Sequence, residues 1–123
     1  MTKNLRITTL ALASGMVLGW TGHLMAADNA SAAMNAYMES MQKMDSQMKQ
    51  SMDKMHAGAS KATADHHFVT MMIPHHMGAV DMAKIELKYG SDPMLRKMAQ
   101  KIVSSQTKEI QELKAWQTKH PMP

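Results

Sequence analysis

The stretch from Ala26 to Ala64 contains no Leu, Ile, Val or Phe, yet methionine recurs through it at helical spacing. Each residue turns an α-helix by about 100°, so these methionines fall within an arc of about 120° and form one face. Seven side chains make up this Met stripe: Met34, Met38, Met41, Met44, Met48, Met52 and Met55. A stripe of methionine usually fills a core, because methionine fits irregular apolar gaps. Since no branched aliphatic residue accompanies it, we expect its sulfur atoms to bind metal, whether or not the same face also packs.

A second cluster combines methionine with histidine. The segment from Met71 to Met77 contains His75 and His76 and follows His66 and His67 closely. Residues four apart are neighbours on a helix. Two ridges result: His67, Met71 and His75 on the first, and Phe68, Met72 and His76 on the second. Thioether and imidazole are ligands of soft metal ions, so we expect donors from these ridges, with a sulfur from the Met stripe, to form a low-coordinate Cu(I) site that also takes Ag(I).

The chain contains no cysteine. This absence excludes disulfides, thiolate metal sites and a thiol nucleophile. Zinc is disfavoured for the same reason, because its usual ligands are Cys, His and carboxylate. In an oxidising compartment, thiols tend to become disulfides, whereas methionine stays a neutral ligand. The composition therefore favours a soft-metal site outside the cytoplasm.

The N-terminus has the pattern of a secretory signal peptide, predicted over residues 1–27. Lys3 and Arg6 precede an apolar stretch that is short for a membrane span, and small residues near Ala27 then give way to polar ones. We expect cleavage near Ala27, with 30–32 as a second candidate, and a periplasmic protein rather than an uncut anchor. Cleavage lowers the formal net charge from +4 to +2, because 12 of the 14 Lys and Arg remain against 10 Asp and Glu. This charge gives no reason to expect a nucleic-acid partner.

The remaining residues, 28–123, are enough for one small domain with a thin core. We expect it to be all-α, a small antiparallel bundle of three long helices. A Met-rich helix over about 31–56 occupies the segment 28–62, and a helical hairpin occupies 63–123. Pro74 lies inside the first helix of the hairpin and removes a backbone hydrogen bond, so we expect a kink or a break there.

Capping residues predict where the hairpin helices begin and end. The first begins at Thr63 or Asp65, with Asp65 expected to cap the helix rather than to bind metal, and it stops at Gly90. The second is capped by Ser91 or Asp92.

The last helix shows how this chain builds ordinary packing. Its apolar stripe, at three- and four-residue spacing, consists of Leu95, Met98, Ala99, Ile102, Ile110 and Leu113, with Trp116 at its edge. The chain therefore uses Leu and Ile where a helix only packs. Gln106 and Glu109 fall within the stripe, where polar groups are rare. Two interpretations stay open: a buried hydrogen-bonded pair that fixes helix register, or groups that orient a ligating imidazole, with Glu86 as a further member.

Other donors complete the candidate set. His66 and Met77 point well away from the face of Phe68 and His75 on an unbroken helix, so they belong to a second metal site or to none. His56 and the tail from His120 to Met122 offer soft-metal donors near the ends of their segments.

Three segments of the hairpin resemble a known family. They are Asp65-x-x-Phe68, Met72-Ile73-Pro74-His75-His76-x-Gly78-Ala79-Val80-Asp81-Met82-Ala83, and Ile102-Val103-x-x-Gln106-x-x-Glu109-Ile110 with Trp116. Together they look like the CopM-type family of secreted bacterial proteins, long filed as a domain of unknown function. The resemblance implies a small helical bundle of ferritin-like appearance that binds copper, and silver as its mimic, outside the cytoplasm. It implies the ligands Met72, His75, His76 and Met82, with Met71 and His67 next. Met77 stands where the family often has Gln.

The sequence therefore predicts a periplasmic protein that binds Cu(I) and Ag(I), with Cu(II) as a further candidate. It would sequester or deliver metal in copper resistance or homeostasis, with a copper exporter or a periplasmic metallochaperone as a candidate partner. The alternative is a module without metal whose Met stripe binds a partner helix. No Glu has His three residues after it, which disfavours a di-iron oxidase, and we expect no enzyme activity. A homodimer stays open.

Overall fold

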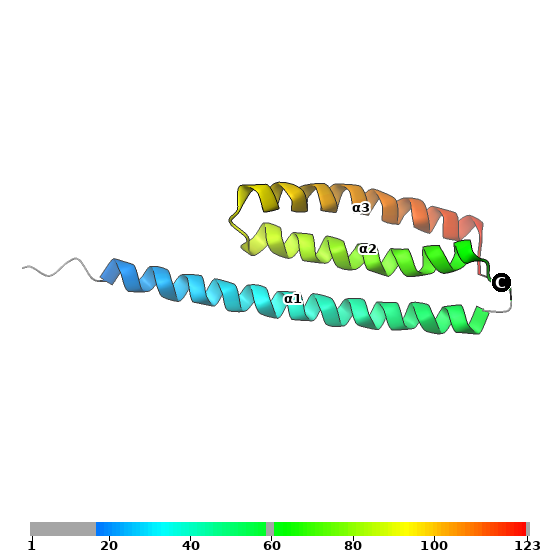
Figure 1. The fold of residues 1–123 in the computed structure, drawn as a ribbon, viewed down its shortest axis with the longest axis horizontal. Helices are drawn as coiled ribbons and strands as arrows, with labels where there is room; N and C mark the ends of the chain where they lie inside the picture. The colour runs from blue at the N-terminus through cyan, green and yellow to red at the C-terminus, as the bar shows by residue number, and fades with distance from the viewer. Residues whose placement is uncertain (1–16, 59–60, 123) are drawn as a thin grey trace, which may run out of the picture.

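The protein consists of three long α-helices joined by short turns (Figure 1). The structure is a computed structural model that describes residues 17–58 and 61–122. The helices are α1 (Val17–Gly58), α2 (Ala64–Tyr89) and α3 (Pro93–Lys119), and the described residues contain no strand. The predicted all-α class with three long helices is confirmed.

The first helix is longer than the predicted range of 31–56. It begins at Val17 and continues through the predicted cleavage position at Ala27. Alanine recurs from 26 to 36, and alanine is the strongest helix former. Of the predicted signal peptide, residues 1–16 lie outside the described part of the chain. Within the described part, no helix has both the length and the apolar character needed to cross a membrane.

The three helices form one open layer. α2 lies between α1 and α3 and packs against both (Figure 1). No Cα atom of α1 lies within 8 Å of a Cα atom of α3 in the described residues. A three-helix bundle closes its core by bringing all its helices together. Here each outer helix has a single neighbour, so both broad faces of the layer remain open to solvent.

Local sequence explains where the hairpin helices start. Thr63 is the N-cap of α2, and its side chain and that of His66 form a reciprocal capping box. Asp65 therefore does not cap the helix as predicted, but lies in its first turn. Asp92 caps α3 as predicted, accepting a hydrogen bond from the backbone N–H of Leu95 at 2.9 Å. Arg96 then ties the turn together by donating to the carbonyls of Leu87 and Gly90.

Two residues of α2 behave differently from their expected roles. Gly90 ends the helix, but with φ −74° and ψ 147° it does not use the left-handed conformation that usually favours glycine. Its lack of a side chain matters because a Cβ atom would collide with the carboxylate of Glu86. Pro74 does not break α2, which is continuous from Ala64 to Tyr89, so of the predicted kink or break the break is wrong.

The apolar core is thin, as predicted. Only Val69, Val80, Ala83 and Ala99 are buried hydrophobic residues in the described part of the chain, and no large side chain there is fully buried. Three of these four lie on α2 and one lies on α3. The hairpin of α2 and α3 therefore holds most of the apolar core, and α1 packs against it by other means.

Candidate metal centre

α1 and α2 approach each other closely at Gly78. A Cβ atom at this position would lie 2.5 Å from the sulfur of Met44, so the absence of a side chain lets Met44 lie across α2. Nearby, Lys43 donates a hydrogen bond to the carboxylate of Asp81 at 2.7 Å. These two contacts fix an antiparallel register. A residue a given number of positions after Met44 on α1 lies opposite the residue the same number of positions before Gly78 on α2.

This register brings part of the Met stripe against the first Met–His ridge. It places Met48 opposite Pro74, Ser51 opposite Met71, and Met55 opposite His67. Around α2, His67 and Met71 lie within about 20° of Gly78. Both side chains are therefore on the side of α2 that faces α1.

The Met stripe is divided between packing and solvent. Met44, Met48 and Met55 are half-buried. The other four side chains are largely exposed: Met34 (62%), Met38 (50%), Met41 (50%) and Met52 (45%). A stripe that served only as a core would be buried along its length. This one turns an edge toward α2 and leaves the rest of its sulfur atoms accessible.

The half-buried sulfurs and the first ridge form one candidate site, which we call the Met–His seam: Met44, Met48 and Met55 from α1, with His67 and Met71 from α2. His67 and Met71 are half-buried, and His75 continues the ridge as an exposed side chain. The Nε2 atom of His67 is buried and has no hydrogen-bond partner among the described residues. A buried polar atom of this kind is costly to leave unpaired. The seam therefore holds a nitrogen donor without a partner beside several thioethers.

The donor chemistry of the seam is soft. Thioethers and imidazole suit Cu(I) and Ag(I), whereas carboxylate-rich sites suit harder ions. No group of three or more His, Cys, Asp or Glu side chains in residues 17–58 and 61–122 is arranged to hold a metal ion. At the seam, methionine adds a further donor type to such side chains.

The second ridge faces α3 instead. Phe68, Met72 and His76 line a groove of about 440 Å³ between α2 and α3, whose other walls include Glu109 and Trp116. Because α1 and α3 lie on opposite sides of α2 (Figure 1), this ridge does not face the Met stripe. The predicted combination of ridge donors with a sulfur from the first helix fits the first ridge only.

His76 is held by a carboxylate. Its Nε2 atom lies 2.6 Å from Oε2 of Glu109, and its side chain is only 11% exposed. Because a carboxylate accepts hydrogen bonds, Nε2 carries the proton in this contact. The other ring nitrogen, Nδ1, is buried and finds no partner in the described residues. The ring centroids of His75 and His76 are 6.1 Å apart and the ring planes are tilted by 59°, and His75 is exposed.

Gln106 and Glu109 do not bond to each other. The buried pair is wrong, because Glu109 bonds to His76 and the Oε1 atom of Gln106 is buried without a partner in the described residues. Glu109 does orient an imidazole. Glu86 does not join this group, but lies beside Tyr37 in a different groove between α2 and α3.

The remaining donors lie away from the seam. His66 uses its Nδ1 atom in the N-cap, 2.8 Å from Oγ1 of Thr63, and its ring meets Trp116 edge-on at 5.3 Å. His120 stacks on the same indole, with ring centroids 4.4 Å apart. These contacts tie the start of α2 to the end of α3.

Three methionines and one histidine are also separate from the seam. Met77 lines a groove with Thr70 and Lys54, and Met82 lines one with Tyr37 and Glu86. His56 is exposed near the end of α1. No sequence pattern indicates that Met122 returns to α1, where its side chain packs beside Gly58.

The groove around Met82 also contains Tyr37, whose phenol has a pKa above its ordinary value. Partial burial, and to a lesser extent the negative charge of Glu86, raise the pKa of the Tyr37 phenol above its ordinary value. Tyr37 is the point where α1 reaches this groove, which α2 and α3 otherwise form. Its residue type and position on the edge of the Met stripe were visible in the sequence, but its neighbours were not.

Comparison with known proteins gives a family but no function. No curated protein matches the chain. A family model described as "Domain of unknown function (DUF305)" matches residues 10–117, which include all of α2, most of α3 and the whole Met–His seam. Because the match covers most of the chain, the protein belongs to the DUF305 family.

Proposed function

We propose that this protein binds Cu(I), and Ag(I) as its larger analogue, at the Met–His seam. The observation that carries the proposal is the buried Nε2 atom of His67, which has no partner among the described residues and faces a helix whose inner edge is lined by thioethers. A metal ion would satisfy this nitrogen, whose burial without a partner costs about 1–3 kcal/mol. Low-coordinate Cu(I) accepts such mixed nitrogen and sulfur donors.

Further donors lie exposed beside the seam in a single copy of the chain. His75 and four methionines of the Met stripe are accessible to solvent next to the seam. We infer a binding rather than a catalytic role, in which the protein sequesters or delivers copper in resistance or homeostasis. The resemblance to CopM-type proteins and the N-terminal pattern support a periplasmic location, with a copper exporter or a metallochaperone as the partner.

The two donor types give the proposal a pH dependence. Imidazole must be deprotonated to bind metal, whereas a thioether has no proton to lose. Cu(II) prefers imidazole and Cu(I) tolerates thioether. Removal of His67 and His75 should therefore weaken Cu(II) binding more than Cu(I) binding, and acidification should act in the same direction.

A competition titration tests the seam. The chain, processed as the cell exports it, is titrated with Cu(I) against a chromophoric chelator, and then with Zn(II). The test variant is Met48→Leu/Met55→Leu, which removes two seam sulfurs and keeps similar volume. The matched control is Met34→Leu/Met38→Leu, which removes two exposed sulfurs from the same stripe.

We expect tight Cu(I) binding, little Zn(II) binding, and an affinity for Cu(I) at least about tenfold lower in the seam variant than in the control, a difference of about 1.4 kcal/mol. Equal loss in both variants would contradict a localised seam and assign binding to the stripe as a whole. No competition with even a weak chelator would contradict copper binding itself.

A second candidate function is a protein-interaction module without metal. It is favoured by the exposure of Met34, Met38, Met41 and Met52, which leaves a flexible apolar surface open. This module would keep its partner binding in the absence of any metal ion.

A further inference from the structure

The exposed apolar side chains are not scattered over the protein. Nine large hydrophobic residues in the described part of the chain are largely exposed, and we call their common surface the Met face: Met34, Met38, Met41, Met52, Phe68, Met82, Met94, Leu95 and Met98. All three helices contribute to it. Single exposed apolar residues are normal on protein surfaces, but a contiguous set usually marks an interaction site.

Helical periodicity places these residues on one side of the layer. On α2, Phe68, His75 and Met82 recur every seven residues and form a line along the helix. Thr70, Met77 and Lys84 form a second line two residues later, which is about 200° around the helix. The two lines therefore lie on opposite broad faces.

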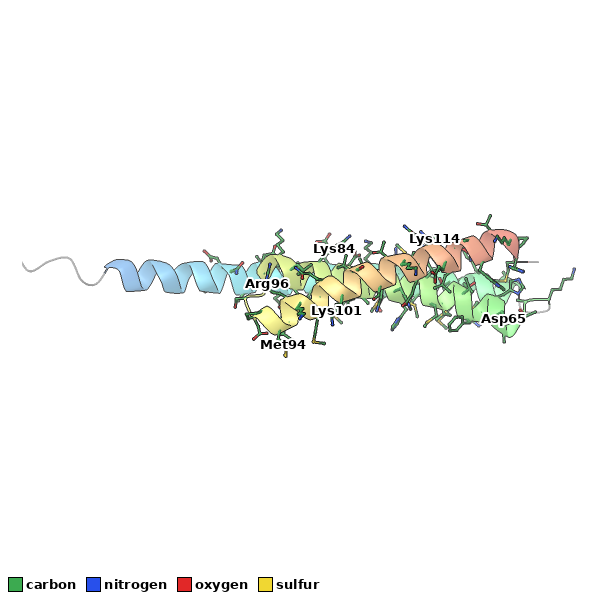
Figure 2. All side chains as sticks on the ribbon, turned by 90° about the horizontal axis from the view of Figure 1, so that it is seen from above. Asp65, Lys84, Met94, Arg96, Lys101 and Lys114 are labelled. Atoms are coloured by element: carbon green, nitrogen blue, oxygen red, sulfur yellow. The ribbon has the colours of Figure 1, made fainter. Side chains whose placement is uncertain are left out.

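The grooves agree with this division. Met82, Leu95 and Met98 share one groove with Tyr37, which joins all three helices on the Met face. Thr70 and Met77 share another groove with residues of α1 that are turned away from the Met stripe, among them Lys54. Figure 2 views the layer from its α3 edge: Met94 and Asp65 lie along one side, and Lys84 and Lys114 lie along the other.

The Met face is larger than a monomer usually exposes. If a fully exposed side chain of this size presents roughly 200 Å², the nine exposed fractions correspond to about 900 Å². The largest apolar patch on a typical monomer is about 300–600 Å², and each partner in a standard protein interface buries about 800 Å². The face therefore has the size of one side of a stable interface.

The protein also lacks the core that would let it stand alone. Only four hydrophobic residues in the described part of the chain are buried, and no large side chain there is fully buried. Small domains with so little core usually need oligomerisation or another stabilising device.

We propose that the Met face is covered by a second copy of this chain, so that two open layers stack face to face into a closed double layer. A two-fold dimer uses the same patch on both partners, and the apolar side chains of one Met face are complementary to those of another. The Met stripe recurs with a mean spacing of 3.5 residues, which is the repeat of helices that pack along a shared seam. The stripe of one copy therefore suits the stripe of the other.

Charge selects the second copy over a membrane surface. Lys43, Lys54, Lys84, Lys88 and Lys114 lie on the side opposite the Met face, by the same helical count. The Met face instead has acidic groups at its margin: Asp65, Glu86, Glu109 and Glu112 line its grooves. Anionic lipid attracts basic segments and repels acidic ones. An antiparallel dimer keeps the end that contains Asp65, Glu109 and Glu112 away from the same end of its partner.

The dimer would also affect the metal centre. His75 lies on the line of Phe68 and Met82, so the exposed ligand beside the seam is on the covered face. A second copy would bring further thioethers to that side. The dimer itself does not rest on metal binding, because the apolar surface alone favours it.

Sedimentation equilibrium of the metal-free, naturally processed chain tests the proposal. The face variant is Met94→Lys/Met98→Lys, which adds two charges at residues that are 65% and 52% exposed. The matched control is Gln100→Lys/Thr107→Lys, which adds the same charges to the same helix on the opposite side. The chain has no cysteine, so a single Cys at 82 or at 84 gives a unique probe of burial on each face.

We expect twice the mass of one chain for the wild type and the control, and a dimer weakened about 100-fold or more in the face variant, because two charges would be buried in an apolar interface. Circular dichroism should show unchanged helix content. Maleimide should react slowly with Met82→Cys and quickly with Lys84→Cys. The seam variant Met48→Leu/Met55→Leu should remain dimeric, so that a failed copper titration leaves this result unaffected.

Three results would overturn the dimer. One is a monomer at every concentration, with equal maleimide rates at 82 and 84. Another is a dimer that both lysine variants weaken equally, since the interface would then lie elsewhere. The third is a monomer that floats with neutral phospholipid vesicles through the Met face, which would assign that face to a lipid surface.

Discussion

The two sides of α2 pack through different types of side chain. On the side that faces α3, α2 has Val69, Val80 and Ala83, which pack against Ala99 and the aliphatic stripe of α3. On the side that faces α1, α2 has Gly78, His67 and Met71, and the α1 residues that pack there are serine, alanine and methionine. The same helix therefore takes part in one ordinary apolar interface and one that is rich in sulfur and contains a buried nitrogen without a partner in the described residues.

This difference indicates a division of labour. Branched aliphatic side chains have few rotamers and specify a fixed packing, whereas methionine adapts its shape and offers a ligand atom. The hairpin of α2 and α3 acts as the scaffold. α1 is attached through a close approach at Gly78 and the pair Lys43–Asp81, which is partly exposed and so contributes little stability.

The largest effect is expected from damage to the scaffold. Val80→Asp places an unpaired charge at a residue that is 7% exposed, which costs about 3–5 kcal/mol. We expect loss of most helical signal in circular dichroism, because α1 has no other helix in the described residues to pack against. Lys84→Asp, one turn away and exposed, is the control. Equal unfolding by both variants would show that charge alone, not burial, is responsible.

Gly78→Val should weaken the packing of α1 against α2 and leave the packing of α2 against α3 intact. Its side chain would meet the sulfur of Met44, and overpacking of this kind costs about 2 kcal/mol. Hydrogen exchange should accelerate in α1 while α2 and α3 stay protected, and Met44→Ala should restore part of the protection. Ala79→Val, the half-buried neighbour, controls for helix propensity. If exchange accelerates equally in all three helices, α1 is part of the scaffold and the comparison fails.

A smaller effect is expected at the contact between His76 and Glu109. Glu109→Gln keeps an acceptor but removes the charge from a contact of 2.6 Å to a mostly buried imidazole, so we expect a loss of about 1 kcal/mol in urea unfolding. The imidazole proton signal on Nε2 should broaden. Glu112→Gln, whose partner Lys108 is 3.7 Å away and exposed, should change stability by less than about 0.5 kcal/mol. A larger loss at Glu112 would contradict the assignment.

The smallest effect concerns Tyr37. Burial, and then Glu86, raise its pKa in the folded protein. The protonated phenol therefore favours the folded state, and this stability is complete below the ordinary tyrosine pKa and is lost as the pH rises through the raised value. Tyr89→Phe leaves Tyr37 as the sole tyrosine, so tyrosinate absorbance reports it alone. Adding Glu86→Gln should lower the midpoint, but only in part. An unchanged midpoint would exclude the charge of Glu86 as a cause.

Much of the fold could be predicted because it depends on local chemistry. The spacing of apolar residues predicts three helices, and Asp92 and Gly90 predict the turn between the last two. Of the two predicted starts of α2, Thr63 is confirmed as the N-cap and Asp65 is wrong, and of the predicted kink or break at Pro74 the break is wrong. Thr63 competes as a cap through a reciprocal bond with His66, and packing holds the helix together around a buried proline.

The candidate site divides in the same way. The sequence by itself determined the donor chemistry, the helical phase of each donor and the two ridges, because residue type and the 100° turn per residue are local properties. Only the tertiary structure decided that the first ridge faces the Met stripe, that Glu109 holds His76, and that Met34 and Met38 remain exposed. These features depend on which helices touch and in what register. That register follows from the contact of Met44 with Gly78, two residues that are far apart in the chain and that no local pattern connects.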